Sequence, residues 1–307
     1  MDELIEKINK FQNPTVVGLD TSLNFIPKFI KQAAIKQFGN THKAAAHAIL
    51  NFNKSIIDEI CKLVPAVKLQ SAYYELYGFY GIWALTETLN YCKIKNMFTI
   101  LDGKKNDIGP SMTAYSNAYL GQSQLPNGGE CRAFQCDALT VNPYLGTDSI
   151  KPIEKNCTKF NKSAFILIKT SNPSSNELQN IKLKNNQLMF EHVAELCTKF
   201  SSHKNSKYGF NKIGAVVGAT YATELKMLRL QLPHTFFLVP GFGAQGADIC
   251  KIKLAFNKNK TGAIINSSRA IIGAWIKSNC SEHEFAKQAR TAVLQMKNQI
   301  QNLLHKN

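Results

Sequence analysis

The segment from Asp102 to Asp107 carries charged side chains at a spacing that could do chemistry. It reads Asp-Gly-Lys-Lys-Asn-Asp and directly follows an apolar run. In an extended strand alternate residues share a face, so Asp102 and Lys104 should point the same way, while Gly103 permits close approach. Lys68 lies in another apolar run and reaches the same space if the two strands are parallel neighbours. Such a cluster is costly to desolvate, so it either forms a balanced network or acts on a ligand, and a solvated loop with salt bridges is the alternative.

A glycine-rich loop and an arginine lie late in the chain. The loop runs from Pro240 through Gly241-Phe242-Gly243-Ala244-Gln245-Gly246, and Ser268 and Arg269 follow the next apolar run. The glycine spacing formally matches the dinucleotide fingerprint, but that fingerprint belongs after an early strand and needs an acidic residue after the next one. We interpret the loop instead as a phosphate site, where backbone N–H groups surround the oxygens and Arg269 supplies a charged fork. A tight glycine turn without a ligand is the alternative.

The elements that must position these residues follow an alternating pattern of short β-rich runs and longer helical segments. The predicted strands are Thr15–Asp20, Ala66–Gln70, Phe98–Asp102, Ala138–Val141, Ala164–Lys169, Gly214–Gly218, Phe236–Val239 and Ala263–Asn266. Eight such units in a chain of this length predict a (β/α)₈ TIM barrel formed as a single domain over residues 1–307. In this fold, function lies at the carboxyl ends of the strands, where the polar residues above are found.

The intervening segments show helical periodicity or loop composition. The clearest helix follows the capping box Ser281-x-x-Glu284 and places Phe285, Ala289, Ala292, Met296, Ile300 and Leu303 on one face. Three polar, helix-poor insertions are read as loops that decorate the barrel, namely Gly121–Gln135, Ser171–Asn186 and Ser201–Asn211. We therefore expect no domain boundary inside the chain.

The charge of the chain is strongly positive but does not favour a nucleic-acid surface. The 307 residues include 37 Lys and Arg against 21 Asp and Glu, which gives a formal net charge of +16. Only four of the basic residues are Arg, whereas nucleic-acid recognition relies on Arg for bidentate and stacked contacts. The lysines are dispersed along the chain. A small anionic substrate fits this pattern better, and a basic RNA-binding protein remains an alternative.

Other classes of protein are disfavoured by what the sequence lacks. No apolar run approaches the roughly 20 residues that span a bilayer, and the acidic, amphipathic start Met1–Glu6 does not resemble a signal peptide, so we expect a cytoplasmic protein without a membrane partner. The closest of the eight cysteines, Cys131 and Cys136, have four residues between them, so no zinc or redox knuckle is formed. We expect structural thiols and no metal site.

Six motifs in order resemble the orotidine 5′-phosphate decarboxylase family, in its longer-chain branch. They are Gly18-Leu19-Asp20, Val67-Lys68-Leu69-Gln70, the signature Asp102-x-Lys104-x-x-Asp107, Lys169-Thr170-Ser171-Asn172-Pro173, the loop Pro240–Gly246 and Asn266-Ser267-Ser268-Arg269. Two departures are visible, because the branch usually has Arg-Gly at Lys105-Asn106 and the family usually has Thr at Ser111. Neither departure removes a charged member of the signature.

The resemblance implies an activity and a set of roles. The family converts orotidine 5′-phosphate to uridine 5′-phosphate and CO₂, the last step of de novo pyrimidine biosynthesis, without a metal or an organic cofactor. It implies Lys104 as the general acid that protonates C6 of the pyrimidine. The other residues whose roles it implies are Asp102 beside the departing carboxylate, Lys68 between this network and the ribose, Asp20 on the ribose hydroxyls, Ser171 and Gln245 on the pyrimidine, Gln245 and Arg269 on the phosphate, and Ser111, Pro240 and Ser268 as further substrate contacts.

The resemblance further implies a homodimer with shared active sites, in which Asp107 of one chain completes the site of the other. The nearest alternative enzyme is another phosphate-binding barrel, a lyase or aldolase that acts on a sugar phosphate with a metal. That chemistry needs additional acidic ligands near the strand ends, whereas Asp20, Asp102 and Asp107 already have roles here.

Overall fold

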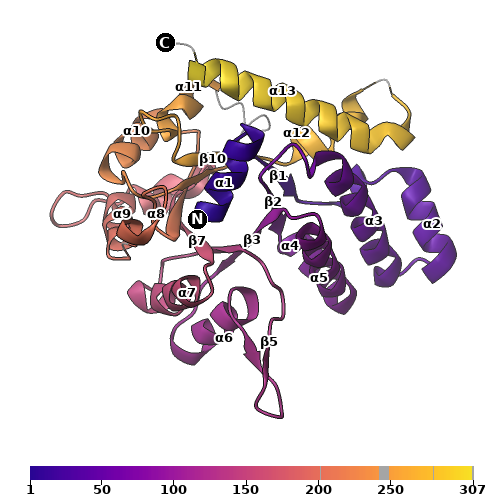
Figure 1. Ribbon diagram of the computed structural model, residues 1–307, viewed down its shortest axis with the longest axis horizontal. Helices are drawn as coiled ribbons and strands as arrows, with labels where there is room; N and C mark the ends of the chain where they lie inside the picture. The colour runs from indigo at the N-terminus through magenta and orange to yellow at the C-terminus, as the bar shows by residue number, and fades with distance from the viewer. Residues whose placement is uncertain (201, 242–248, 279, 306–307) are drawn as a thin grey trace.

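A closed barrel of eight parallel strands forms the centre of the protein in this computed structural model, which describes residues 1–200, 202–241, 249–278 and 280–305 (Figure 1). The strands follow one another around the barrel in the order β1, β2, β3, β6, β7, β8, β9 and β10, and β10 pairs with β1 to close it. Their bounds are β1 Thr15–Leu19, β2 Ala66–Gln70, β3 Phe98–Lys105, β6 Ala138–Val141, β7 Ser163–Lys169, β8 Ile213–Val217, β9 Phe237–Val239 and β10 Ala263–Ser267. The predicted (β/α)₈ TIM barrel is confirmed.

Helices surround the barrel on its outer side (Figure 1). Their bounds are α1 Asp2–Phe11, α2 Lys28–Phe38, α3 His42–Ile60, α4 Ala72–Glu75, α5 Gly78–Ile94, α6 Gly109–Tyr119, α7 Thr147–Lys159, α8 Asn176–Gln179, α9 Met189–Thr198, α10 Ala222–Gln231, α11 Ile249–Ile252, α12 Arg269–Ile272 and α13 Phe285–His305. Within the described ranges, no helix is long and apolar enough to cross a membrane.

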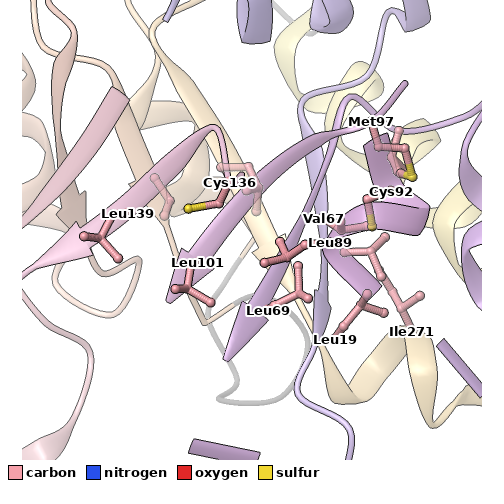
Figure 2. Packing of buried hydrophobic residues seen from close by; sticks show 14 of the residues in the cluster. Leu19, Val67, Leu69, Leu89, Cys92, Met97, Leu101, Cys136, Leu139 and Ile271 are labelled. Atoms are coloured by element: carbon pink, nitrogen blue, oxygen red, sulfur yellow. The ribbon is translucent and has the colours of Figure 1, made fainter. Parts of the chain in front are cut away.

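Alternation along each strand divides the apolar side chains between two cores. Val16, Ile100 and Phe165 point into the barrel and belong to one buried cluster. The residues between them belong to an outer cluster shared with the helices, and Figure 2 labels Leu69 and Leu101 of this cluster together with Leu89 and Cys92 from α5. The strands are buried on both faces, which explains why they read as continuous apolar runs.

Helix α1 closes the amino-terminal end of the barrel. Its residues Leu4 and Ile5, together with Met1, join the interior cluster rather than the outer one. The amino group of Met1 also donates a hydrogen bond to Ser163 Oγ at the start of β7, at 2.7 Å. Figure 1 shows this helix lying across the middle of the strands. The opposite, carboxyl-terminal end is therefore the end at which a cavity can form.

Apart from shifts of one residue at the ends of five strands, three details differ from the prediction. Strand β3 continues to Lys105 rather than ending at Asp102, because the chain resumes pairing with β6 after an irregularity between Leu101 and Lys105. The insertion 121–135 contains a small hairpin of β4, Ser123–Gln124, and β5, Glu130–Cys131, and the insertion 171–186 contains α8. In the last helix Val293 is buried as well, because it stands four residues after Ala289 and three before Met296 on the same face.

Candidate active site

The register of the sheet brings Lys68 and Asp102 together inside the barrel mouth. In β2 and β3, Lys68 is paired with Ile100, and Gln70 with Asp102. Ala66 and Ile100 belong to the interior cluster, so the side chains that follow them at even spacing also face inward. In β2 and β3 the inward-facing apolar residues are thus followed, toward the carboxyl end of the barrel, by a charged residue. This is the placement that the sequence predicted.

These strands hold an array of charges whose signs alternate. The Lys68 ammonium donates to Asp102 Oδ2 at 2.8 Å and to Asp20 Oδ1 at 3.2 Å. The Lys104 ammonium donates to the other carboxylate oxygen of Asp102 at 2.7 Å. Lys68 and Asp102 are only 4% and 8% exposed, whereas the Lys104 side chain is 45% exposed. The array therefore runs from a buried ion pair to an ammonium that is open to the cavity.

Two neutral side chains complete the surroundings of the Asp102 carboxylate. Thr140 on β6 donates its hydroxyl hydrogen bond to Oδ1 at 2.9 Å, and Gln70 on β2 donates from Nε2 to Oδ2 at 3.2 Å. With the two lysines, four donors converge on one carboxylate. A buried carboxylate that is paired and hydrogen-bonded in this way is held in a fixed orientation.

The network keeps its ionised form against the effect of burial. Burial favours the neutral carboxyl of Asp102, but the charges of Lys68 and Lys104 and their hydrogen bonds outweigh it, and its pKa lies well below the usual value. Burial likewise opposes the charge of Lys68, yet Asp102 and Asp20 raise its pKa above the usual value. At neutral pH the centre of the array is therefore an ion pair and not a neutral acid–amine pair.

Lys104 reaches Asp102 through an unusual backbone conformation. Its φ angle is +45°, in the left-handed region that costs a non-glycine residue about 1 kcal/mol or more. The backbone N–H of Lys104 donates to Thr140 Oγ1 at 2.9 Å, which holds this conformation in place. Simple strand alternation predicts the correct neighbour for Lys104, but the geometry depends on this local irregularity. Strain of this kind is frequent at functional sites.

A cavity of about 450 Å³ lies over this array. Its floor includes Lys68, Asp102, Lys104 and Thr140 from the strand ends. The remaining lining residues come from later strands and from the segment after β7, namely Leu167, Thr170, Ser171, Asn172, Ser174, Ser175, Leu178, Gln179, Val216, Leu238, Pro240 and Asn266. The volume falls in the range of small-molecule sites.

Residues predicted for phosphate binding lie at the same end of the barrel. Ser268 directly precedes α12, and Arg269 is the exposed first residue of that helix. Gly18 on β1 is required here, because a Cβ atom on it would lie 1.8 Å from Ser268 Oγ. Pro240 lines the cavity, whereas Gln245 lies outside the described residues.

Five of the predicted residues that the structure describes are not among those that line the cavity, namely Asp20, Asp107, Ser111, Ser268 and Arg269. Asp107 follows β3, and its carboxylate accepts a hydrogen bond from the backbone N–H of Ile108 at 2.8 Å. Ser111 is exposed on α6. Neither of them is among the cavity-lining residues of the described ranges. Both stay predictions, and the one for Asp107 requires a second chain.

The structure adds polar residues to which the prediction assigned no role. Thr140 binds Asp102, and Gln179 lines the cavity. Asn266 also lines it, and its Oδ1 atom is buried without a hydrogen-bond partner among the described residues. An inward-facing Thr in a strand gives no signal by itself, but Asn266 stands at the end of an apolar run, which could have marked it as a site residue.

A closed parallel barrel with a charged cavity at the carboxyl ends of its strands places the protein in the class of (β/α)₈-barrel enzymes. The family model described as "Orotidine 5′-phosphate decarboxylase / HUMPS family" matches residues 44–278, and the chain belongs to this family. The predicted family is thereby confirmed.

Individual relatives agree with this assignment. The chain is 39% identical to the orotidine 5′-phosphate decarboxylase of Caldicellulosiruptor saccharolyticus and 40% identical to that of Caldicellulosiruptor bescii, over 97% of this chain and 97% of each relative. Among solved structures it is similar to the OMP decarboxylase of Leishmania donovani, with a TM-score of 0.72 and 25% identity, over 100% of this chain and 98% of the other.

Proposed function

We propose that this protein removes CO₂ from orotidine 5′-phosphate to give uridine 5′-phosphate, the last step of de novo pyrimidine biosynthesis. The observation that carries the proposal is the alternating array of Asp20, Lys68, Asp102 and Lys104 beneath a small-molecule cavity. Relatives that carry the decarboxylase name align with nearly the whole chain, which supports the same substrate.

In the proposed reaction the bond between C6 and the carboxylate breaks, CO₂ leaves, and the electron pair stays on C6. Lys104 then transfers a proton from its ammonium to C6, so that a C–H bond replaces the C–C bond. Before the transfer, the same ammonium stabilises the negative charge that develops at C6. Its exposure to the cavity and its 2.7 Å contact with Asp102 support this role.

The Asp102 carboxylate can contribute repulsion of the substrate carboxylate, but this effect is too small to explain catalysis. Two like charges about 4 Å apart cost roughly 4 kcal/mol at an effective dielectric constant near 20. Full relief of that repulsion corresponds to about three decades of rate. A difficult decarboxylation needs more than this, so stabilisation of the carbanion by a preorganised Lys104 carries most of the effect in our proposal.

The rest of the cavity would bind the remaining parts of the substrate. We assign Asp20 to the ribose hydroxyls, Ser171 and Gln245 to the pyrimidine, and Gln245 and Arg269 to the phosphate. Ser111, Pro240 and Ser268 are proposed as further contacts. Phosphate binding far from C6 would then supply the energy that fixes the charges around the reacting carbon.

The proposal also covers the oligomeric state of the protein and its cellular location. We infer a cytoplasmic homodimer in which each chain, residues 1–307, forms one domain and Asp107 completes the partner's site. The position of Asp107 outside its own cavity supports this arrangement. We also propose that the reaction needs neither a metal nor an organic cofactor.

Decarboxylation should persist when metals are chelated. The purified protein is expected to consume orotidine 5′-phosphate, followed by its ultraviolet absorbance, at the same rate with and without EDTA, because the proposed proton donor is an ammonium group. An activity that EDTA abolishes and Mg²⁺ or Zn²⁺ restores would instead favour a metal-dependent sugar-phosphate barrel. Salt-sensitive RNA retention without turnover would favour an RNA-binding protein.

Replacing Arg269 with alanine should lower the turnover of the phosphorylated substrate but not that of the phosphate-free nucleoside. If the guanidinium grips the phosphate, kcat/KM for orotidine 5′-phosphate should fall about 100-fold, while turnover of the phosphate-free nucleoside should hardly change. Arg290→Ala is a matched control, because Arg290 lies on α13 and contacts the Glu59 carbonyl. Equal losses on both substrates would show that Arg269 has a structural role.

A further inference from the structure

Lys169 is a buried cation outside the charge array. It ends β7, its side chain is fully buried, and no ion pair of the described residues includes it. Its ammonium donates to Asn180 Oδ1 at 2.7 Å and to Asn176 Oδ1 at 3.1 Å. It also lies 4.5 Å from the centre of the Tyr221 ring. Glu224 acts on this ammonium as a charge without an ion-pair contact. A cation whose direct partners are amide oxygens and aromatic rings is costly to bury, so its presence needs an explanation.

The two asparagines that Lys169 binds belong to the segment that covers the cavity. Residues 170–180 supply seven of the sixteen cavity-lining residues, including Ser171. A second contact fixes the ends of this segment, because the backbone N–H of Thr170 donates to Gln179 Oε1 at 2.9 Å and Gln179 Nε2 donates to Thr170 Oγ1 at 2.7 Å. Lys169 thus ties the far end of the segment to the rigid barrel.

The geometry at Ser171 shows what this anchor holds in place. Ser171 packs directly on the backbone of Gly218, where an added Cβ would lie 2.9 Å from the Ser171 side chain. The backbone N–H of Gly218 donates to the Lys169 carbonyl at 2.7 Å. The chain on either side of Ser171 is therefore fixed by backbone contacts before it and by the Lys169 ammonium after it.

We propose that Lys169 is a positioning residue, which holds residues 170–180 over the cavity so that Ser171 meets the pyrimidine. This inference rests on the proposed function, since it assigns the segment to substrate binding. An apolar residue could fill the same space without the cost of burying a charge. Only a long cationic side chain can reach from the end of β7 to two amide oxygens on and beside α8, with charge-assisted hydrogen bonds.

The variant Lys169→Met tests the proposal, because it keeps the unbranched side chain and removes the donors. We expect KM for orotidine 5′-phosphate to rise about tenfold with little change in kcat, and Tm to stay level or increase. Lys184→Met, at an exposed lysine beyond the segment, should leave KM unchanged. An unchanged KM for Lys169→Met, whether or not its Tm falls, would overturn the positioning role.

A second variant keeps the test valid if Lys169→Met does not fold. The double variant Asn176→Ala/Asn180→Ala removes the same contacts without changing β7, and it should raise KM to the same extent, with its fold checked by thermal unfolding. Combined with Lys169→Met, the effects should not add, because all three changes remove the same contact. Additive losses would contradict the proposal.

Proteolysis separates this inference from the proposed function. Glu177 is exposed within the segment, and cleavage after it by a Glu-specific protease should be faster in Lys169→Met than in wild type or Lys184→Met. If wild type does not turn over orotidine 5′-phosphate, the proposed function fails, while faster cleavage still supports the anchor. Equal cleavage rates in all three proteins would overturn the anchor, whatever the activity.

Discussion

Lys104→Ala is expected to lower kcat/KM for orotidine 5′-phosphate by about 10⁴-fold or more. In our account, Lys104 acts both as the general acid at C6 and as the cation next to the developing carbanion. General acids contribute about 10²- to 10⁴-fold, and a preorganised electrostatic donor about 10²- to 10³-fold. Steady-state kinetics on the purified variant, with a limit set by the uncatalysed background, measures the loss.

The neighbouring lysine provides the control for this variant. Lys105 directs its ammonium to Glu75, at 3.3 Å, and away from Asp102. Lys105→Ala should therefore keep most of the activity. The Lys104→Ala protein should remain folded, because Asp102 retains its contacts with Lys68 and Thr140. A Lys104→Ala variant within about tenfold of wild type would remove Lys104 from the proposed chemistry.

Mixed dimers of Lys104→Ala and Asp107→Ala chains should regain about a quarter of wild-type activity. Each variant alone should be nearly inactive. In a closed twofold dimer with shared sites, one site of the mixed dimer contains both substitutions and the other site contains neither. Random equal mixing makes about half the dimers mixed, and half of their sites intact, if the sites are independent. Activity after co-refolding, with the mixed species quantified by tagged chains, measures the recovery.

A second pair of variants shows whether the recovery of activity depends on active sites that are shared between chains. Lys68 and Lys104 contact Asp102 within one chain, so a mixed dimer of Lys68→Ala and Lys104→Ala chains has a lesion in each site. This mixture should regain nothing. If demonstrably mixed dimers of Lys104→Ala and Asp107→Ala also regain nothing, then Asp107 does not act across the interface, and its assignment is wrong.

The sequence predicts the array at the strand ends because two simple periodicities determine it. Apolar runs locate the strands, and the period of two along each strand places Lys68 and Asp102 on the inner face. Parallel order then puts their carboxyl ends at one edge of the barrel, as the register of β2 and β3 confirms. The predicted strand bounds differ from the observed ones by one residue in most strands.

The remaining features depend on interactions that no local pattern encodes. Lys104 adopts a positive φ that its residue type disfavours, and the Thr140 hydroxyl that holds it comes from another strand. The segment 170–180 reads as a polar loop, since its short helix α8 is fixed by Lys169 and not by an apolar face. The role proposed for Asp107 requires a second chain, which no pattern within one chain encodes.

The most direct test of the central claim is the product that purified wild-type protein forms from orotidine 5′-phosphate in D₂O. We expect one CO₂ for each uridine 5′-phosphate, with deuterium at C6, because the proton transferred by Lys104 exchanges with solvent. Mass spectrometry and proton NMR of the nucleotide measure both quantities. Unchanged orotidine 5′-phosphate, or a product that keeps its carboxylate, would contradict the account.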